Sequence, residues 1–172
     1  MGQDDTKHNL LFISKYPEII HEFTDAMKDR DIEIETAING IEAAAKIKKK
    51  NYDIVITGLS LEGYNGEQII TYLNKTAPST VCIIYTTTIS SAQLHFFINE
   101  RNVFRVFLRP VDFRGAFWEA LEEAYEYHAV QVKNEEDTGA RRQEQEKQER
   151  EIEIMDQRMR SQRQARETTN RY

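Results

Sequence analysis

Five residues with a bearing on chemistry stand within two positions of the end of a short apolar run in this 172-residue chain: Ser14, Lys15, Gly58, Thr86 and Arg109. Two are cations and two carry hydroxyl groups. Lys15, Thr86 and Arg109 together would suit a small anion such as phosphate or a carboxylate, because their groups donate hydrogen bonds to oxyanions. Gly58, which follows the run 54–57, stands out because it has no side chain that could take part in chemistry. Whether the five meet in space depends on the elements that carry them.

The first part of the chain alternates apolar runs typical of buried strands with segments that have helical spacing. The predicted strands are 10–13, 32–35, 54–57, 81–85 and 103–108. Helices are predicted after each of them, with Pro17 in the first turn of the first. The residues expected to face inward are Ile20, Phe23 and Met27; Ile41, Ala44, Ala45 and Lys48; Ile69, Ile70 and Leu73; Leu94, Phe97 and Ile98; and Phe113, Phe117, Leu121 and Ala124.

A strict strand–helix alternation predicts an α/β fold with a five-stranded parallel sheet, doubly wound so that helices cover both faces. The run 32–35 alternates apolar and acidic residues, as a half-covered edge strand would. In such a sheet the ligand crevice lies at the carboxyl ends of the strands. The five residues named above are therefore expected to meet there.

The order of these elements resembles the receiver domain of bacterial two-component response regulators, of the flavodoxin-like chemotaxis-regulator type. The resemblance covers roughly residues 8–130. It depends on the run 54–57 leading to Gly63 and Gly66, on Thr86 after the fourth run, and on Arg109 with Pro110 after the fifth.

The resemblance implies specific roles for the five positions. Receivers hold Mg²⁺ with an acidic pair after the first strand, matched here by Ser14 and Lys15, and phosphorylate an aspartate matched by Gly58. A Thr or Ser is kept as Thr86, and the usual Lys is Arg109. Without the three carboxylates the site lacks oxygen ligands for Mg²⁺ and lacks an acceptor. We expect a degenerate pseudo-receiver that is not phosphorylated, uses no metal or other cofactor, and is not an enzyme.

Two interpretations of the vacated crevice stay open. Lys15, Thr86 and Arg109 would bind a small anion or a phosphorylated metabolite, which would make the protein a sensor. Alternatively, Lys15 pairs with Glu62 or another nearby acid and fills the crevice itself. The internal pair is the favoured interpretation because it needs no ligand.

Composition excludes several other classes. The net charge is −6 and no basic patch is evident, which argues against nucleic acid as a partner. No apolar run approaches 18 residues and no signal-peptide pattern is present, so a cytoplasmic bacterial protein without a membrane segment is expected. The single cysteine, Cys82, lies in an apolar run, and the four histidines share no metal-ligand spacing.

Composition changes near Asn134, which predicts a receiver-like domain over 1–133 and a charged tail, helical or partly disordered, over 134–172. A helix break is expected at Thr138 and Gly139. On the last receiver helix a second stripe would form a partner surface unless the tail covers it: Trp118, Tyr125, Ala129 and Val132.

In the tail, Ile152, Met155 and Met159 follow coiled-coil spacing, with Gln145, Gln148, Gln162 and Arg166 on the same line. Residues 144–156 hold six acidic and two basic side chains, whereas 157–172 hold five basic and one acidic. Such a helix could pair antiparallel with a second copy. The apolar heptads are few, so a solvated helix that orders only on a partner is the favoured interpretation.

Together these features predict a protein–protein interaction module in bacterial signal transduction, with the small-anion sensor as the alternative. The expected partner is another protein, or a second copy of the chain bound through the last receiver helix or the tail.

Overall fold

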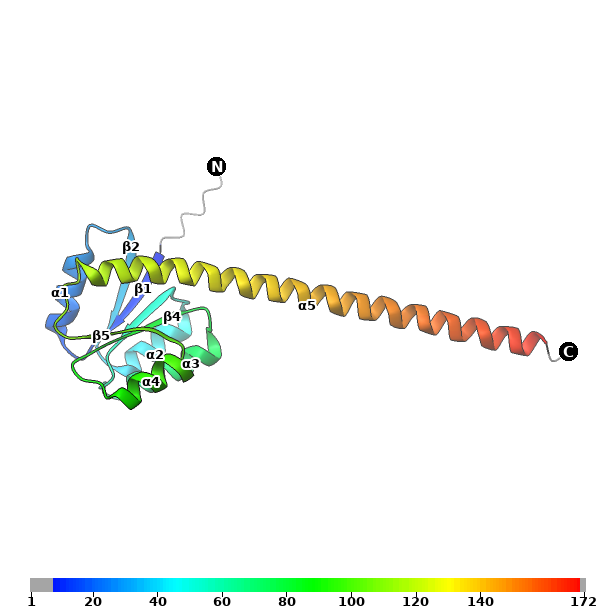
Figure 1. Ribbon diagram of the computed structural model, residues 1–172, viewed down its shortest axis with the longest axis horizontal. Helices are drawn as coiled ribbons and strands as arrows, with labels where there is room; N and C mark the ends of the chain where they lie inside the picture. Colours follow the sequence, from blue (N-terminus) through cyan, green and yellow to red (C-terminus); the bar gives the residue numbers. More distant parts are fainter. Residues whose placement is uncertain (1–7, 171–172) are drawn as a thin grey trace. The chain divides into compact units, whose positions relative to one another are not determined.

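The computed structural model describes residues 8–170, and the chain divides into two compact units, one ending at Gln131 and the other beginning at Val132. The elements of the first unit are β1 (His8–Ile13), α1 (Pro17–Met27), β2 (Ile32–Ala37), α2 (Gly40–Lys49), β3 (Ile54–Thr57), α3 (Gly66–Thr76), β4 (Val81–Thr86), α4 (Ser91–Glu100) and β5 (Val103–Leu108). The last helix, α5 (Ala116–Thr169), begins in the first unit and makes up the described part of the second (Figure 1).

The five strands form one sheet in the order β2-β1-β3-β4-β5, and every neighbouring pair is parallel. The predicted doubly wound α/β fold is therefore confirmed, with β2 and β5 at the edges. The central strands are almost wholly buried, because parallel connections place helices on both faces of a sheet. Within residues 8–170, no helix is both long and apolar enough to cross a membrane.

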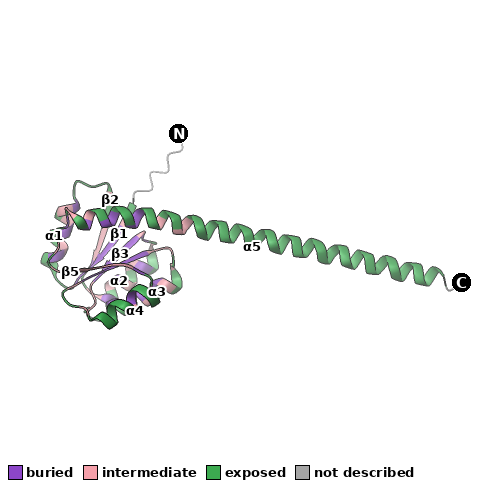
Figure 2. Ribbon diagram, in the orientation of Figure 1, coloured by how far each residue is buried: buried purple, intermediate pink, exposed green. Residues whose placement is uncertain are grey.

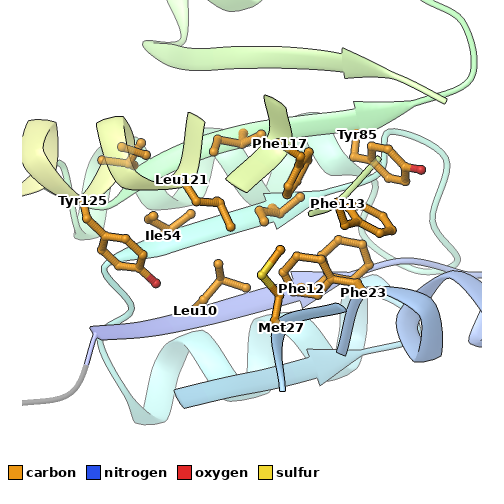
Figure 3. Close-up of a cluster of buried hydrophobic side chains, with 14 of the residues drawn as sticks. Leu10, Phe12, Phe23, Met27, Ile54, Tyr85, Phe113, Phe117, Leu121 and Tyr125 are labelled. Atoms are coloured by element: carbon orange, nitrogen blue, oxygen red, sulfur yellow. The ribbon is translucent and has the colours of Figure 1, made fainter. Parts of the chain in front are cut away.

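Alternate residues of the central strands enter two separate cores, as the two-residue period of a strand requires. Leu10, Phe12 and Ile54 pack on one face with residues of α1 and α5. Figure 3 shows these sheet residues facing Phe117 and Leu121 of α5. Leu11, Ile13, Val55, Cys82 and Ile84 pack on the other face with residues of α2, α3 and α4.

The first core is rich in aromatic rings. Phe12 of β1 stacks on Phe23 of α1 with centroids 4.2 Å apart, and Phe113 meets the edge of Phe23 at 5.3 Å. Phe113 was expected on the last helix, but it lies in the turn before α5 and is nevertheless buried. The aromatic rings thus hold α1, the sheet and the start of α5 together.

The expected inward residues were correct for α3 and only partly correct elsewhere. In α1 the buried residues are Ile19, Phe23 and Met27, with Ile20 half-buried. In α2 the buried residues are Gly40, Ala43 and Ile47, and Ile41 is exposed. Gly40 lies against the backbone of Tyr64, since a Cβ there would be 1.8 Å from the Tyr64 carbonyl oxygen.

In α4 only Phe97 is buried, while Leu94 and Ile98 are each 40% exposed. The apolar residues at helical spacing in α4 therefore do not all face the core. These two apolar side chains are instead part of the surface.

The break predicted at Thr138 and Gly139 is absent, because α5 runs unbroken to Thr169. A single interior glycine costs a helix about 1 kcal/mol, which the strong helix formers on either side outweigh. Every residue from 133 to 170 is exposed, and this part of α5 is coloured as exposed throughout in Figure 2.

At the amino edge of the sheet, Asp53 ties the first-unit part of α5 to the strands. His128 Nε2 of α5 lies 3.1 Å from Asp53 Oδ1, and the Asn9 backbone N–H donates to Asp53 Oδ2 at 3.2 Å. His128 Nδ1 lies 2.8 Å from the carbonyl oxygen of Ser79. Burial alone would raise the pKa of the Asp53 carboxyl, but the bonds from His128 and Asn9 outweigh it and lower that pKa.

We expect Asp53→Asn to lower the free energy of unfolding by about 1–2 kcal/mol at neutral pH, because a charged acceptor is lost. A lowered folded-state pKa means that the stabilisation is complete above the unfolded value near 3.8 and is lost as the pH falls through the folded value. Urea unfolding from pH 7 down to about pH 3 should therefore show the two proteins converging in acid.

The control is Asp25→Asn, since Asp25 pairs only with the exposed cations Lys28 and Arg114 within the described chain. It should change the free energy of unfolding by less than about 0.5 kcal/mol. A difference between Asp53→Asn and the original protein that persists unchanged in acid would contradict the role given to Asp53.

Candidate functional site at the carboxyl edge of the sheet

All five strand-end residues singled out from the sequence line one open cavity of about 70 Å³. Its lining consists of Ser14, Lys15, Tyr16, Gly58, Leu59, Ser60, Tyr85, Thr86, Thr87 and Arg109. The structure thus brings Ser14, Lys15, Gly58, Thr86 and Arg109 together. Sequence reasoning missed the two tyrosines, although each is the immediate neighbour of a residue it had singled out.

The register of the sheet explains why these residues meet. Ile13 of β1 lies opposite Thr57 of β3, and Thr57 lies opposite Ile84 of β4. β1 and β3 end at this level, and β4 continues for two residues to Thr86. Past that level the Gly58 N–H donates to the Ile13 carbonyl at 3.0 Å, and the Arg109 N–H donates to the Thr86 carbonyl at 2.8 Å. The backbone therefore fixes the floor of the cavity.

Lys15 does not form the internal ion pair that was favoured. Its Nζ lies 3.4 Å from Ser60 Oγ and 5.2 Å from the centroid of the Tyr16 ring. Among residues 8–170 no acidic side chain lies within ion-pair distance of it. Glu62 instead contributes its backbone carbonyl, which accepts from the Gly40 N–H at 2.9 Å. The ammonium group thus faces hydroxyl and aromatic neighbours rather than a carboxylate.

Arg109 lies between two phenol rings. Its guanidinium carbon is 4.7 Å from the centroid of Tyr16 and 5.9 Å from that of Tyr85, which are cation–π distances. Burial raises the pKa of the Tyr85 hydroxyl, and the Arg109 guanidinium opposes part of that rise. Tyr85 is therefore neutral at physiological pH and can donate a hydrogen bond. Thr86 Oγ1 makes only a long hydrogen bond of 3.4 Å to the Thr88 carbonyl.

The fold does not require glycine at position 58. A Cβ added to Gly58 would have the Tyr85 carbonyl oxygen as its nearest neighbour at 3.7 Å, an ordinary contact distance. Gly66 is the opposite case, because a Cβ there would lie 2.1 Å from the Gly58 carbonyl oxygen. Packing thus demands glycine at position 66 but not at position 58.

The residues present do not fit a Mg²⁺ site. Mg²⁺ and similar hard cations bind oxygen ligands, carboxylates above all. The cavity lining contains no Asp or Glu, and two of its residues, Lys15 and Arg109, are cationic. Nowhere in the described part of the chain do three or more His, Cys, Asp or Glu side chains gather as a metal would need.

The second stripe predicted on the last receiver helix is not an open surface. Tyr125 is buried, and its hydroxyl donates to the Asn9 carbonyl at 3.3 Å. Trp118 is half-buried, with the Arg30 guanidinium 4.3 Å from its ring centroid. Val132 is half-buried and only Ala129 is exposed. The stripe prediction was therefore wrong for Tyr125, whose ring closes the first core. For Trp118, Ala129 and Val132 a role in partner contact stays a prediction.

The tail residues proposed as a contact lie in the second unit. Ile152, Met155 and Met159 are 65%, 63% and 55% exposed. Ile154, which the heptad line does not include, is also exposed at 50%. These residues are the large apolar side chains of an otherwise polar and charged stretch.

Comparison with known proteins defines the class. The Response regulator receiver domain family matches residues 11–115, and the chain belongs to this family, which acts in two-component signalling. No curated protein matches the chain.

Several solved structures share the fold. The chain is 18% identical to a CheY-like receiver domain protein from Methanospirillum hungatei JF-1, covering 73% of this chain and 99% of that one with a TM-score of 0.66. For the signal receiver domain of an HD domain-containing protein from Pseudomonas fluorescens Pf-5, the identity is 19%, the coverage 72% and 98%, and the TM-score 0.68. For TrrA from Thermotoga maritima, crystallised with Mg²⁺-BeF, the corresponding values are 21%, 68% and 98%, and 0.58.

Proposed function

We propose that this receiver domain works without phosphorylation, as a protein-interaction module of a signalling complex. The observation that carries the proposal is Gly58, which lies at the end of β3 with room for a side chain and has none. A phosphoryl group needs a nucleophilic oxygen at that place and a metal beside it. Where the metal's carboxylates would be needed, the cavity supplies Ser14 and Lys15.

The module comprises residues 1–133, and 134–172 form a charged tail. Within the module, the surface around β5 is the contact we favour. We call it the β5 surface and define it by Leu94, Ile98, Leu108 and Tyr127, which are 40%, 40%, 50% and 44% exposed.

Two contacts support the β5 surface as one patch. β5 is an edge strand packed against α4, and its Phe104 meets Tyr127 of α5 with ring centroids 5.2 Å apart. Exposed apolar residues that gather beside an unpaired strand edge are typical of protein contacts.

The small-anion sensor is the second candidate, and the surroundings of Tyr16 favour it. Lys15 Nζ and the Arg109 guanidinium carbon lie 5.2 and 4.7 Å from the same ring centroid, so two cations flank one phenol. No carboxylate lines the cavity between them. An oxyanion placed there would relieve their repulsion and accept hydrogen bonds from Thr86 and Ser60.

The absence of phosphorylation can be tested by incubating the protein with acetyl phosphate and Mg²⁺ and measuring its intact mass. We expect no added phosphate. Gly58→Asp alone should fold normally, because the cavity has room for a side chain, and should stay unmodified, because the metal ligands are still missing. Adding Ser14→Asp and Lys15→Asp to that variant supplies all three carboxylates, and this triple variant should gain phosphate.

Stoichiometric acid-labile phosphate on the original chain would overturn the proposal. Efficient modification of the single variant Gly58→Asp would show instead that the metal ligands have been assigned to the wrong residues.

The interaction role predicts that partner capture depends on the β5 surface. With the chain as bait in an extract of its native cells, Leu94→Glu with Leu108→Glu should reduce capture of a specific protein at least tenfold. Burying the two leucines contributes about 1.5–3 kcal/mol each, and a factor of ten corresponds to about 1.4 kcal/mol. Ile41→Glu, at an exposed position of α2, is the matched control. If the double variant and the control lose capture to the same extent, the β5 surface is not the contact.

The sensor candidate predicts that inorganic phosphate raises the melting temperature by binding the folded state. At ten times the dissociation constant the stabilisation would be about 1.4 kcal/mol. Lys15→Ala and Arg109→Ala should each abolish the rise, whereas Lys49→Ala, at an exposed position of α2, should leave it intact. Chloride at equal ionic strength controls for screening. If millimolar phosphate produces no rise beyond that of chloride, the sensor function is excluded.

A further inference from the structure

The tail part of α5 carries a short apolar line that nothing covers within residues 8–170. Ile152, Met155 and Met159 are all more than half exposed and recur at alternating steps of three and four. Residues at this spacing share one side of a helix. The same line continues through Gln145, Gln148, Gln162 and Arg166, so polar positions bracket a small apolar centre.

The charges of this helix are separated along its length. Residues 144–156 hold six acidic and two basic side chains, and residues 157–172 hold five basic and one acidic. The boundary between the halves falls between Met155 and Met159, at the centre of the apolar line. Within one copy few of these charges are paired, since the ion pair found here among the described residues joins Arg160 and Asp156 at 3.7 Å.

A parallel pair of such helices is opposed by its charges. The positions that flank the apolar line would then place like charges opposite one another: Glu144 with Glu149, Glu151 with Asp156, and Arg158 with Arg163, each twice. Charges at these positions set the orientation of coiled coils, and like charges facing each other are unfavourable.

An antiparallel pair is compatible with the same charges. When Met155 lies opposite Met159 of the second copy, the acidic half of each helix lies along the basic half of the other. Glu149 then faces Arg163 twice. Like charges meet only at the centre, where Asp156 faces its equivalent and Arg158 faces its equivalent, and Asp156 is already paired with Arg160.

We propose that a second copy of this chain binds along residues 144–166 as a two-stranded antiparallel coiled coil centred between Met155 and Met159. This proposal does not depend on the function proposed for the receiver. The small apolar centre makes the dimer weak, and the complementary halves make it sensitive to salt.

The orientation can be tested with two single-cysteine additions in the full chain. In the proposed register Gln148 lies opposite Arg166 of the second copy, so a mixture of Gln148→Cys and Arg166→Cys should be cross-linked by a short thiol reagent. Each variant alone should not be, because its two introduced thiols lie 18 residues apart along the pair, about 27 Å. The natural Cys82 is buried, which raises its pKa to about 12, so the unmodified chain should not react.

Sedimentation equilibrium of the full chain tests whether the dimer forms and whether the apolar line is its contact. We expect a monomer–dimer equilibrium that weakens as salt is added. Met155→Gln should weaken it at least tenfold, whereas Ile154→Gln, at an equally apolar exposed position off the line, should change it less than twofold. Both positions are exposed, so neither change should disturb the fold.

The remaining outcomes overturn the proposal. Cross-linking within either single-cysteine variant alone would show a parallel pair. A chain that stays monomeric at high protein concentration and low salt, or a dimer equally weakened by the changes at Met155 and Ile154, would show that the apolar line is not a contact between copies.

Discussion

The burial of β1, β3 and β4 on both faces is the constraint on which the rest of the structure depends. A parallel strand with no exposed face must keep a fixed register with its neighbours, since any slip would expose apolar residues or bury unpaired backbone groups. The alignment of Ile13, Thr57 and Ile84 follows from it. The residues after these strands must then meet at one edge whatever their chemistry, so the cavity is a consequence of the core.

At this edge of the sheet, packing constrains some positions and leaves others free. Packing acts on Gly66, where a single methyl group would collide with the backbone, and leaves position 58 free. The cations Lys15 and Arg109 line the cavity beside that position and lie outside the two cores. Lys15 contacts Ser60 and Tyr16, and Arg109 lies against two phenol rings, so aromatic faces supply part of the stabilisation that carboxylates would give.

The sequence sufficed to predict the sheet, its edge strand β2 and the five strand-end residues, because short apolar runs alternate strictly with segments of helical spacing along the chain. The prediction failed where the spacing of a residue fits two environments equally well, a surface stripe or the core. Tyr125 has the spacing of a surface stripe, yet its ring closes the first core and its hydroxyl reaches Asn9. Likewise, Lys15 was expected to pair with Glu62 across the strand ends, but its ammonium group lies beside the Ser60 hydroxyl instead.

The two units present different physical problems. The receiver buries most of its apolar residues in two cores, and those of the proposed β5 surface are among the ones that stay exposed. The second unit has no core of its own among its described residues, because a single helix can bury little of its own side-chain surface. Its three apolar residues on one line are removed from water only by another molecule. Their small area cannot hold a partner tightly, so the pattern of charges must decide which partner binds and in which direction.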